Sequence, residues 1–177
     1  IRNTEMTRKD LLTAMIVSSD NCAAETLANN YPKGYDNFIV ARTNLIKNMG
    51  LKNTKLYDAT GLSVFNSSTV SDLVLFAPIA YADPVLRSMA NLPQTTVKAI
   101  KKGKEIVIKL RNTNPSVYNH KEVVISKTGF TNPAGRCVLM MTKKLENFYA
   151  VVVLGEPNVR ARTQKVEHLL EYENKTR

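Results

Sequence analysis

The pattern of apolar residues changes at Pro93 from that of helices to that of strands, and this change limits the possible folds. Before this residue, apolar side chains recur at the spacing of a helix, most clearly over residues 11–16. After it, residues 95–100 and 105–110 alternate between apolar and polar, as strands do, on either side of a lysine-glycine turn. Helices followed by antiparallel strands predict an α+β fold.

The same patterns predict the individual elements. Helices are expected over residues 8–18, capped by Thr7, and over 22–28 and 38–49. Another helix follows Ser68 or Thr69, and Pro78 should kink it or lie near a break, while Pro84 begins a short helix. Strands over 95–100, 105–110, 123–131, 136–142 and 148–154 should form one meander, closed by a helix over 158–172. The chain thus divides into a helical lobe, 1–92, and a sheet with a final helix, 93–177.

The charge of the chain is strongly basic, with 25 Lys and Arg against 15 Asp and Glu, a formal net charge of +10. Nucleic acid is the first partner to consider, but the basic residues are spread out, Trp is absent, and no aromatics alternate with the densest lysine cluster at 98–104. A solvated surface suited to an anionic polymer such as cell wall is favoured. No apolar run approaches the roughly 20 residues of a membrane helix. The first residue, Ile1, indicates a longer precursor.

Cysteine and histidine usage predicts neither a metal nor another cofactor. Cys22 and Cys137 lie far apart, and His120 and His168 are isolated, so no spacing typical of a metal site occurs. The two cysteines are either small buried apolar residues or a disulfide pair, and the sequence leaves both open.

The segment 123–131 reads as a buried strand that ends in Lys127-Thr128-Gly129. A cation is costly in a buried strand unless a partner needs its charge, and glycine lets another backbone or a ligand come close. A cation, a hydroxyl and a bare backbone along one strand edge suit an anionic peptide end. The simpler interpretation is an edge strand that happens to end in these residues.

A second polar motif, Ser19-Asp20-Asn21, interrupts two helical segments. Such a turn could hold its side chains at a fixed, buried place. It could equally be a helix cap, since Ser, Asp and Asn are the preferred cap residues.

Together these tripeptides match, in order and context, two of the three motifs of penicillin-binding proteins and class A β-lactamases. The flanking sequences strengthen the match: MTRKDLL at 6–12, YDATGLS at 57–63, STVSDL at 68–73, LRNTN at 110–114 and KTGFTNPAG at 127–135. From residue 6 to about 170 the chain resembles the low-molecular-mass D-alanyl-D-alanine peptidases, and within them the periplasmic endopeptidase branch of the penicillin-binding protein 7 type.

This resemblance implies a β-lactamase/transpeptidase-like fold and a catalytic role for three residues. Ser19 would relay protons to the leaving group, and Asn21 would bind the substrate backbone and hold the catalytic lysine. Lys127 would keep the site electropositive and assist proton transfer. The implied activity is serine-type cleavage of D-Ala-D-Ala peptides through an acyl-enzyme.

The resemblance also implies how substrate is bound. Thr128 and Gly129 would contact it along the strand edge, and the N–H of Phe130 would supply half of an oxyanion hole. Arg162 falls where the family binds the substrate's terminal carboxylate, although a surface arginine is an equal alternative. The implied partners are peptidoglycan stem peptides and β-lactams, in the periplasm or elsewhere in the cell envelope.

The nucleophile is what this sequence does not supply, because no serine has a lysine three residues later. In the family that Ser-x-x-Lys pair lies upstream of Ser-Asp-Asn, after the first strands. The chain should therefore be an inactive part of such an enzyme that lacks the N-terminal strands. Because this loss leaves a sheet edge unpaired, the chain should self-associate or pair with the missing segment. The alternative is a non-catalytic peptidoglycan-binding or regulatory protein that keeps the cleft. A β-lactamase is less favoured, because nothing matches the carboxylate-bearing loop that deacylation needs, although the sequence leaves Glu25 and Asp58 open for that role.

Overall fold

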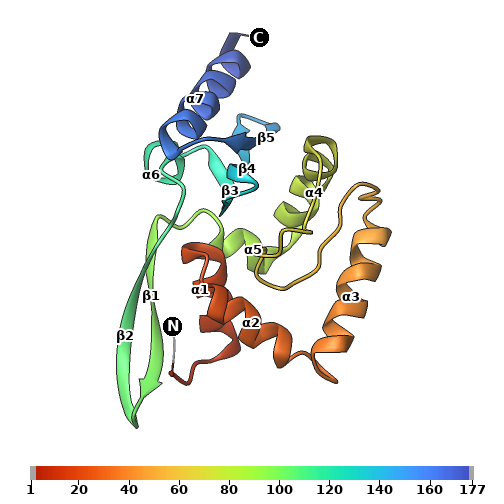
Figure 1. Ribbon diagram of the computed structural model, residues 1–177. Coiled ribbons are helices and arrows are strands. Elements are labelled where there is room, and N and C mark those ends of the chain that lie inside the picture. The colour runs from red at the N-terminus through yellow and green to blue at the C-terminus, as the bar shows by residue number, and fades with distance from the viewer. Residues whose placement is uncertain (1–2, 176–177) are drawn as a thin grey trace.

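The computed structural model describes residues 3–175, with side chains up to residue 171. Its elements are α1 (Arg8–Ser18), α2 (Asn21–Asn29), α3 (Tyr35–Asn48), α4 (Val70–Ala82), α5 (Pro84–Met89), β1 (Gln94–Lys101), β2 (Lys104–Arg111), α6 (Ser116–Asn119), β3 (Val123–Thr131), β4 (Gly135–Lys144), β5 (Asn147–Glu156) and α7 (Val159–Lys175) (Figure 1). Helices come first and antiparallel strands follow, so the predicted α+β fold is confirmed.

Side-chain caps set the helix starts that the sequence predicts. The Thr7 hydroxyl accepts the N–H of Asp10 at 3.1 Å, and the Thr69 hydroxyl accepts the N–H of Asp72 at 3.2 Å. Helix α4 continues past Pro78 to Ala82, so the helix does not break at the proline. Its packing against the sheet through small buried residues offsets the backbone hydrogen bond that a proline removes.

The strands form two sheets rather than the single predicted meander. Strands β1 and β2 pair as a hairpin around Lys102 and Gly103, whose φ angles of 51° and 75° suit a two-residue turn. Strands β3, β4 and β5 form a separate antiparallel sheet. The short helix α6, for which the sequence predicted no element, separates the two sheets and places Val117 in the core beside β3.

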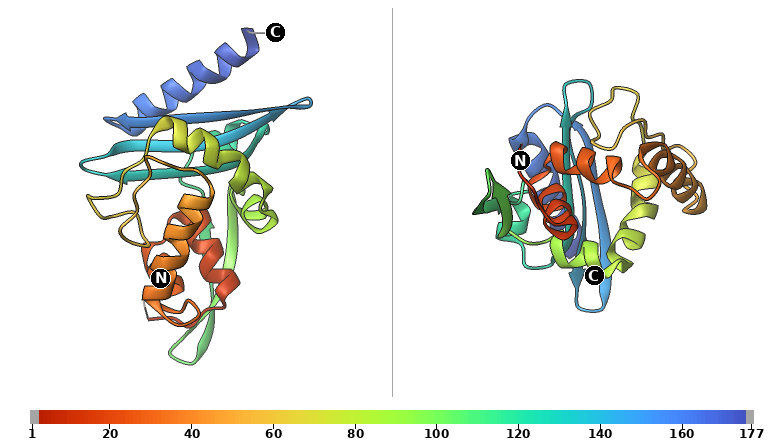
Figure 2. Two further views of the ribbon diagram at one scale, coloured as in Figure 1. Left: turned by 90° about the vertical axis from the view of Figure 1, so that its right-hand side faces the viewer. Right: turned by 90° about the horizontal axis from the view of Figure 1, so that it is seen from below.

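The three-stranded sheet lies between α7 on one face and α4 with α5 on the other (Figure 2). Side chains along β4 alternate between the two faces of the sheet. Val138 and Met140 pack with Val166 of α7, whereas Met141 packs with Ala77 and Ala80 of α4 and with Ala90, which follows α5. In α7, Val166 and Leu170 are buried, whereas the apolar residues Val159 and Leu169 are exposed.

A third apolar cluster positions the functional site. It joins α1 and α2 to α5 and the β1–β2 hairpin, mainly through Ala14, Val17, Met89, Val97 and Leu110. Ile16 packs against this cluster and also against the core beneath α4, which includes residues of β3 and β4. The end of α1 is thereby held against β3.

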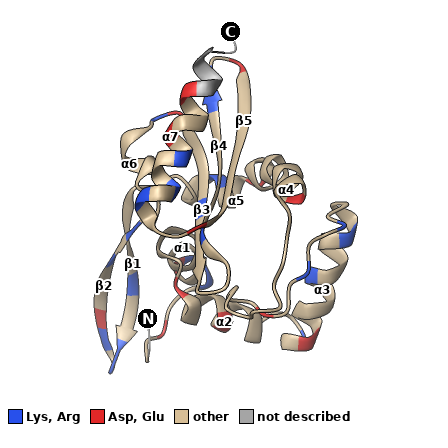
Figure 3. Ribbon diagram, turned by 45° about the horizontal axis from the view of Figure 1, so that its top comes forward, with Lys and Arg blue, Asp and Glu red and all other residues tan. Residues whose placement is uncertain are grey.

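The basic residues are distributed over several elements, including the hairpin, α3 and α7 (Figure 3). On the hairpin, Lys98 pairs with Glu105 at 3.0 Å, and both side chains are exposed. Among the described residues, no helix is both long enough and apolar enough to cross a membrane.

Candidate active site

The Ser19-Asp20-Asn21 turn connects α1 to α2 in a fixed geometry. Ser19 adopts a left-handed conformation, with φ of 55° and ψ of 42°, and ends α1. The Asp20 carboxylate begins α2 by accepting the N–H of Ala23 at 2.8 Å. The cap and the site are therefore not alternatives: Asp20 caps the helix, while Ser19 and Asn21 line a cleft.

The left-handed backbone at Ser19 predicts a difference between two variants that both lose the hydroxyl. A Cβ costs about 1 kcal/mol in this conformation, which glycine adopts freely. Ser19→Gly should therefore be about 1 kcal/mol more stable than Ser19→Ala in urea unfolding. Equal stabilities, or a more stable alanine variant, would contradict the strain assigned to this turn.

Lys127 links the two sequence motifs. From the middle of β3 its ammonium donates to the Ser19 hydroxyl and, at 2.7 Å, to the carbonyl of Thr128. Burial lowers the pKa of Lys127 from 10.5 to about 8. The group is thus mostly protonated at pH 7 and close to its titration range, which suits both anion binding and proton transfer.

Two residues before α6 support this strand, and the sequence assigned neither a role. Asn114, 2% exposed, donates from its amide to the Ser126 hydroxyl at 2.7 Å. The hydroxyls of Thr113 and Thr128 lie 2.5 Å apart. Both residues belong to the LRNTN segment, which is similar to the family's sequence. Their contact with β3 depends on the conformation of a loop, and apolar periodicity does not predict loop conformation.

The structure brings every predicted site residue to one cleft of about 500 Å³. Six further residues line it: Thr60, Gly61, Leu62, Thr113, Arg136 and Val159. A Cβ built on Gly129 would meet only the Cβ of Cys137, at 4.0 Å. The protein's own packing therefore leaves room for a side chain there, which is consistent with space kept for a ligand. The predicted residues in the cleft are Ser19, Asn21, Lys127, Thr128, Gly129, Phe130 and Arg162.

Arg162 lies in the first turn of α7 and is only 4% exposed. Its Nη2 has no hydrogen-bond partner. Burial lowers the pKa of Arg162, and the charge of Arg136 lowers it further. A buried guanidinium with a free N–H group is costly unless an anion binds it, so this position fits a carboxylate site better than a surface arginine.

The wall of the cleft opposite β3 is a loop organised by Asp58. Its carboxylate accepts hydrogen bonds from the Thr60 hydroxyl, from the N–H groups of Gly61 and Leu62 at 3.1 and 3.0 Å, and from the Asn66 amide at 2.7 Å. Burial alone would raise the pKa of Asp58, but these hydrogen bonds lower it to about 2. Asp58 thus holds Thr60, Gly61 and Leu62 along the cleft.

The other candidate ligands and bases lie outside the cleft. Neither Asp58 nor Glu25 is among its lining residues, and Glu25 contacts the Asn29 amide at 3.4 Å along α2. Cys22 and Cys137 are both free thiols. In the described part of the chain, no group of three His, Cys, Asp or Glu residues could hold a metal ion.

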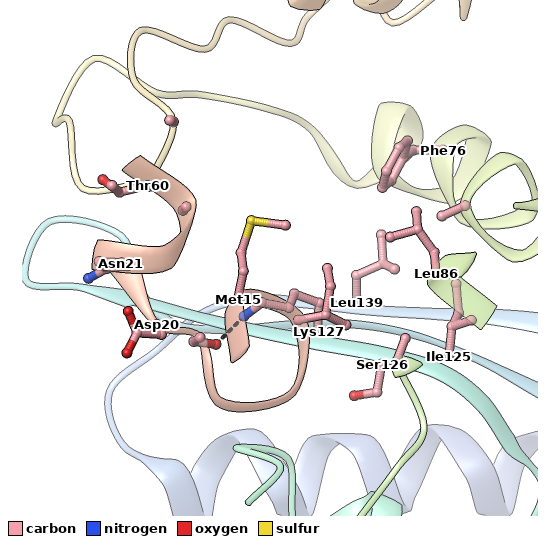
Figure 4. Close-up of a pocket in the computed structure, with 16 residues that line it drawn as sticks. Met15, Asp20, Asn21, Thr60, Phe76, Leu86, Ile125, Ser126, Lys127 and Leu139 are labelled. Atoms are coloured by element: carbon pink, nitrogen blue, oxygen red, sulfur yellow. Dashed lines mark hydrogen bonds between the residues drawn. The ribbon is translucent and has the colours of Figure 1, made fainter. Parts of the chain in front are cut away.

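A second cavity of about 300 Å³ adjoins the cleft and shares Ser19, Asn21 and Lys127 with it. In Figure 4, Met15 and Lys127 lie on one side of this space and Phe76 and Leu86 on the other. The dashed line marks the hydrogen bond from Lys127 to Ser19. Most of the lining is apolar, and Ser19, Asn21 and Lys127 supply polar groups where the cavity meets the cleft.

Comparisons with known proteins identify the family. A family model described as D-alanyl-D-alanine carboxypeptidase matches residues 1–158. The D-alanyl-D-alanine endopeptidase of Escherichia coli K12 is 37% identical over 153 residues, 86% of this chain and 49% of that protein. The Pseudomonas aeruginosa endopeptidase is 36% identical over 139 residues, 78% of this chain and 44% of that protein. The chain thus spans about half the length of these relatives.

Solved structures agree with the fold. The Streptomyces K15 DD-transpeptidase superposes with a TM-score of 0.90 at 24% identity, over 97% of this chain and 69% of that chain. Penicillin-binding protein D2 from Listeria monocytogenes, in a cefotaxime-bound form, gives a TM-score of 0.79 at 28% identity, over 93% of this chain and 65% of that chain. On the strength of the family match, the chain belongs to the D-alanyl-D-alanine carboxypeptidase family of peptidases.

Proposed function

We propose that this chain forms the substrate-binding part of a serine-type D-alanyl-D-alanine peptidase that acts on peptidoglycan peptides. The observation that carries the proposal is the hydrogen bond from Lys127 to Ser19, which joins two distant motifs in the cleft that also contains Arg162. An electropositive cleft with a buried, unpartnered guanidinium at one end suits a peptide that ends in a carboxylate.

In this proposal the peptide lies along the edge of β3, and its main chain pairs with Thr128 and Gly129. Its terminal carboxylate binds the Nη2 of Arg162. The scissile carbonyl oxygen accepts the N–H of Phe130, one half of an oxyanion hole. Such hydrogen bonds stabilise the charge that develops on this oxygen when a nucleophile attacks the carbonyl.

In this proposal, proton transfer takes place at Ser19 and Lys127, at the other end of the cleft from Arg162. Ser19 would relay a proton to the leaving amine, with Lys127 close enough to share it. Asn21 would bind the substrate backbone and hold the lysine of a Ser-x-x-Lys pair. We place that pair on a segment outside this sequence, in contact with the apolar cavity of about 300 Å³ beside Ser19. Because peptidoglycan is the substrate, the site of action is the periplasm or another part of the cell envelope.

This division of roles predicts the response to a β-lactam. The 177-residue chain holds no Ser-x-x-Lys pair, so cefotaxime should leave its intact mass unchanged. The reading frame upstream of Ile1 should encode such a pair, and the longer protein should gain one cefotaxime adduct on that serine. The longer protein with that serine changed to alanine is the matched control.

Two results would contradict the proposal. A single adduct on the 177-residue chain would show that it contains its own nucleophile. An upstream reading frame without a Ser-x-x-Lys pair would instead favour a non-catalytic protein that keeps the cleft for binding peptidoglycan.

A further inference from the structure

The cleft has a cationic end formed by two arginines from different elements. Arg136 lies at the start of β4 and Arg162 in the first turn of α7, and both line the cleft together with Lys127. Among the described residues that line it, none is Asp or Glu. Three cations without an acid concentrate positive potential in a confined space, which an anionic ligand would neutralise.

The side chain of Arg136 is held in place by an aromatic ring. Its guanidinium carbon lies 3.5 Å from the centroid of the Phe130 ring, and the two residues are cross-strand partners in the β3–β4 ladder. A guanidinium stacked on a ring keeps the N–H groups at its edge free for a carboxylate. The stack therefore positions a donor group at the cleft before a ligand arrives.

The backbone before Arg136 is also fixed. Gly135 has a φ of 67°, and a Cβ there would lie 2.9 Å from the carbonyl carbon of Gly155, so only glycine fits. Across the sheet, Arg136 is paired in register with Glu156, but none of the ion pairs among the described side chains joins these two. The charge of Arg136 is thus left for a ligand in the cleft rather than neutralised by its neighbour.

The two guanidiniums differ in depth. Arg162 is 4% exposed, whereas Arg136 is only half-buried, beside the exposed ring of Phe130. One carboxylate on Arg162 would leave Arg136 without a counter-charge in the same cleft. A ligand with two separated carboxylates would satisfy both arginines.

We infer that Arg136 binds a second carboxylate, carried on the side chain of the substrate's C-terminal residue. The site then selects D,D-peptides that end in a dicarboxylic amino acid over those that end in D-Ala or in an uncharged residue of the same size. This inference rests on the proposed function, in which Arg162 binds the main-chain carboxylate.

The test is a set of NMR titrations of the 15N-labelled chain, which detect millimolar affinities. The probes are N-acetyl-D-Ala-D-Ala, N-acetyl-D-Ala-D-Glu and N-acetyl-D-Ala-D-Gln. The D-Glu peptide should bind about tenfold tighter than its D-Gln isostere, as expected for one charge-assisted, partly exposed contact. In Arg136→Gln this preference should disappear, because the D-Glu peptide should lose about tenfold more affinity than the D-Ala and D-Gln peptides, which lose only the long-range attraction of the removed charge.

A control variant and the pattern of affinities distinguish a second carboxylate site at Arg136 from peptide binding in general. Arg160→Gln removes the same charge from an exposed position in α7 and should keep the D-Glu preference. Binding of all three peptides without a D-Glu preference overturns the inference alone. Equal weakening of all three by Arg136→Gln also overturns it, since both arginines would then clamp a single carboxylate. Failure of every peptide to bind contradicts the proposed function and, with it, the inference.

Discussion

Replacing Lys127 with Met should make the folded chain more stable at pH 7 by roughly 3 kcal/mol. Burial lowers the pKa of Lys127 from 10.5 to about 8, and each pKa unit corresponds to about 1.4 kcal/mol. Methionine keeps the length and apolar stem of the side chain and removes the buried charge. The same variant should no longer bind a D-Ala-D-Ala peptide, because the cleft loses the cation that contacts Ser19. Greater stability with lost binding is typical of a functional residue.

The pH dependence of this stability difference follows from the direction of the pKa change. The folded-state pKa lies below the unfolded value, so burial of the ammonium destabilises the fold fully below about pH 8. Between pH 8 and pH 10.5 the unfolded chain binds more protons than the folded chain, and the stability of the wild type rises. The advantage of Lys127→Met should therefore shrink across this range.

Urea unfolding at pH 7, 8, 9 and 10 measures this difference directly. Lys109→Met, the same substitution at an exposed position of β2, is the control and should show neither the stabilisation nor the pH dependence. A Lys127→Met variant that is no more stable than the wild type at pH 7, or whose advantage does not change with pH, would contradict the burial assigned to this ammonium.

Replacing Asp58 with Ala should disorder the wall of the cleft and cost roughly 1–2 kcal/mol of stability, after allowance for the screening of a partly solvated carboxylate. The four donors that now meet this carboxylate would lose their shared acceptor. Because Thr60, Gly61 and Leu62 line the cleft, affinity for a D-Ala-D-Ala peptide should fall by about tenfold, the effect of losing about 1.4 kcal/mol of binding.

The free energy of unfolding at low pH tests whether the charge of Asp58 stabilises this loop. Its folded-state pKa of about 2 lies below the ordinary pKa of 3.8 for an aspartate, so its stabilisation is complete above pH 4 and is lost as the pH falls toward 2. The difference between the wild type and Asp58→Ala should shrink over that window in urea unfolding. Asp58→Asn, which keeps the shape and one acceptor oxygen, should cost less. A difference that stays constant down to pH 2 would show that the charge does not organise this loop.

The sequence predicted most of the fold because its local signals and its tertiary packing agree. The bounds of β3 match the prediction, as do the cap at Thr7 and the turn at Gly103. The errors occur where packing overrides a local signal. The single predicted meander forms two sheets, because the segment after β2 folds as α6 and places Val117 in the core beside β3. Pro78 does not break α4, whose buried alanines pack against the sheet.

Site residues that belong to a short motif could be predicted from the sequence, whereas those that only the tertiary structure brings together could not. Ser19 and Lys127 stand out because polar residues interrupt a helix and a strand, and the family resemblance supplied their roles. Arg136 gave no such signal, because a basic residue after a turn is common. Its importance comes from its stack on Phe130 and its proximity to Arg162, which lies on another element.

A 15N NMR titration of the chain with diacetyl-L-Lys-D-Ala-D-Ala, with the D-Ala-L-Ala diastereomer as control, tests whether the cleft binds D-Ala-D-Ala peptides. We expect saturable shifts at the amides of Thr128, Gly129 and Phe130 and at the Arg162 side chain. These shifts should occur with the D,D-peptide only and should be lost in Arg162→Gln. Equal shifts with both diastereomers, or shifts only at residues outside the cleft, would contradict the proposal that this chain binds D-Ala-D-Ala peptides specifically.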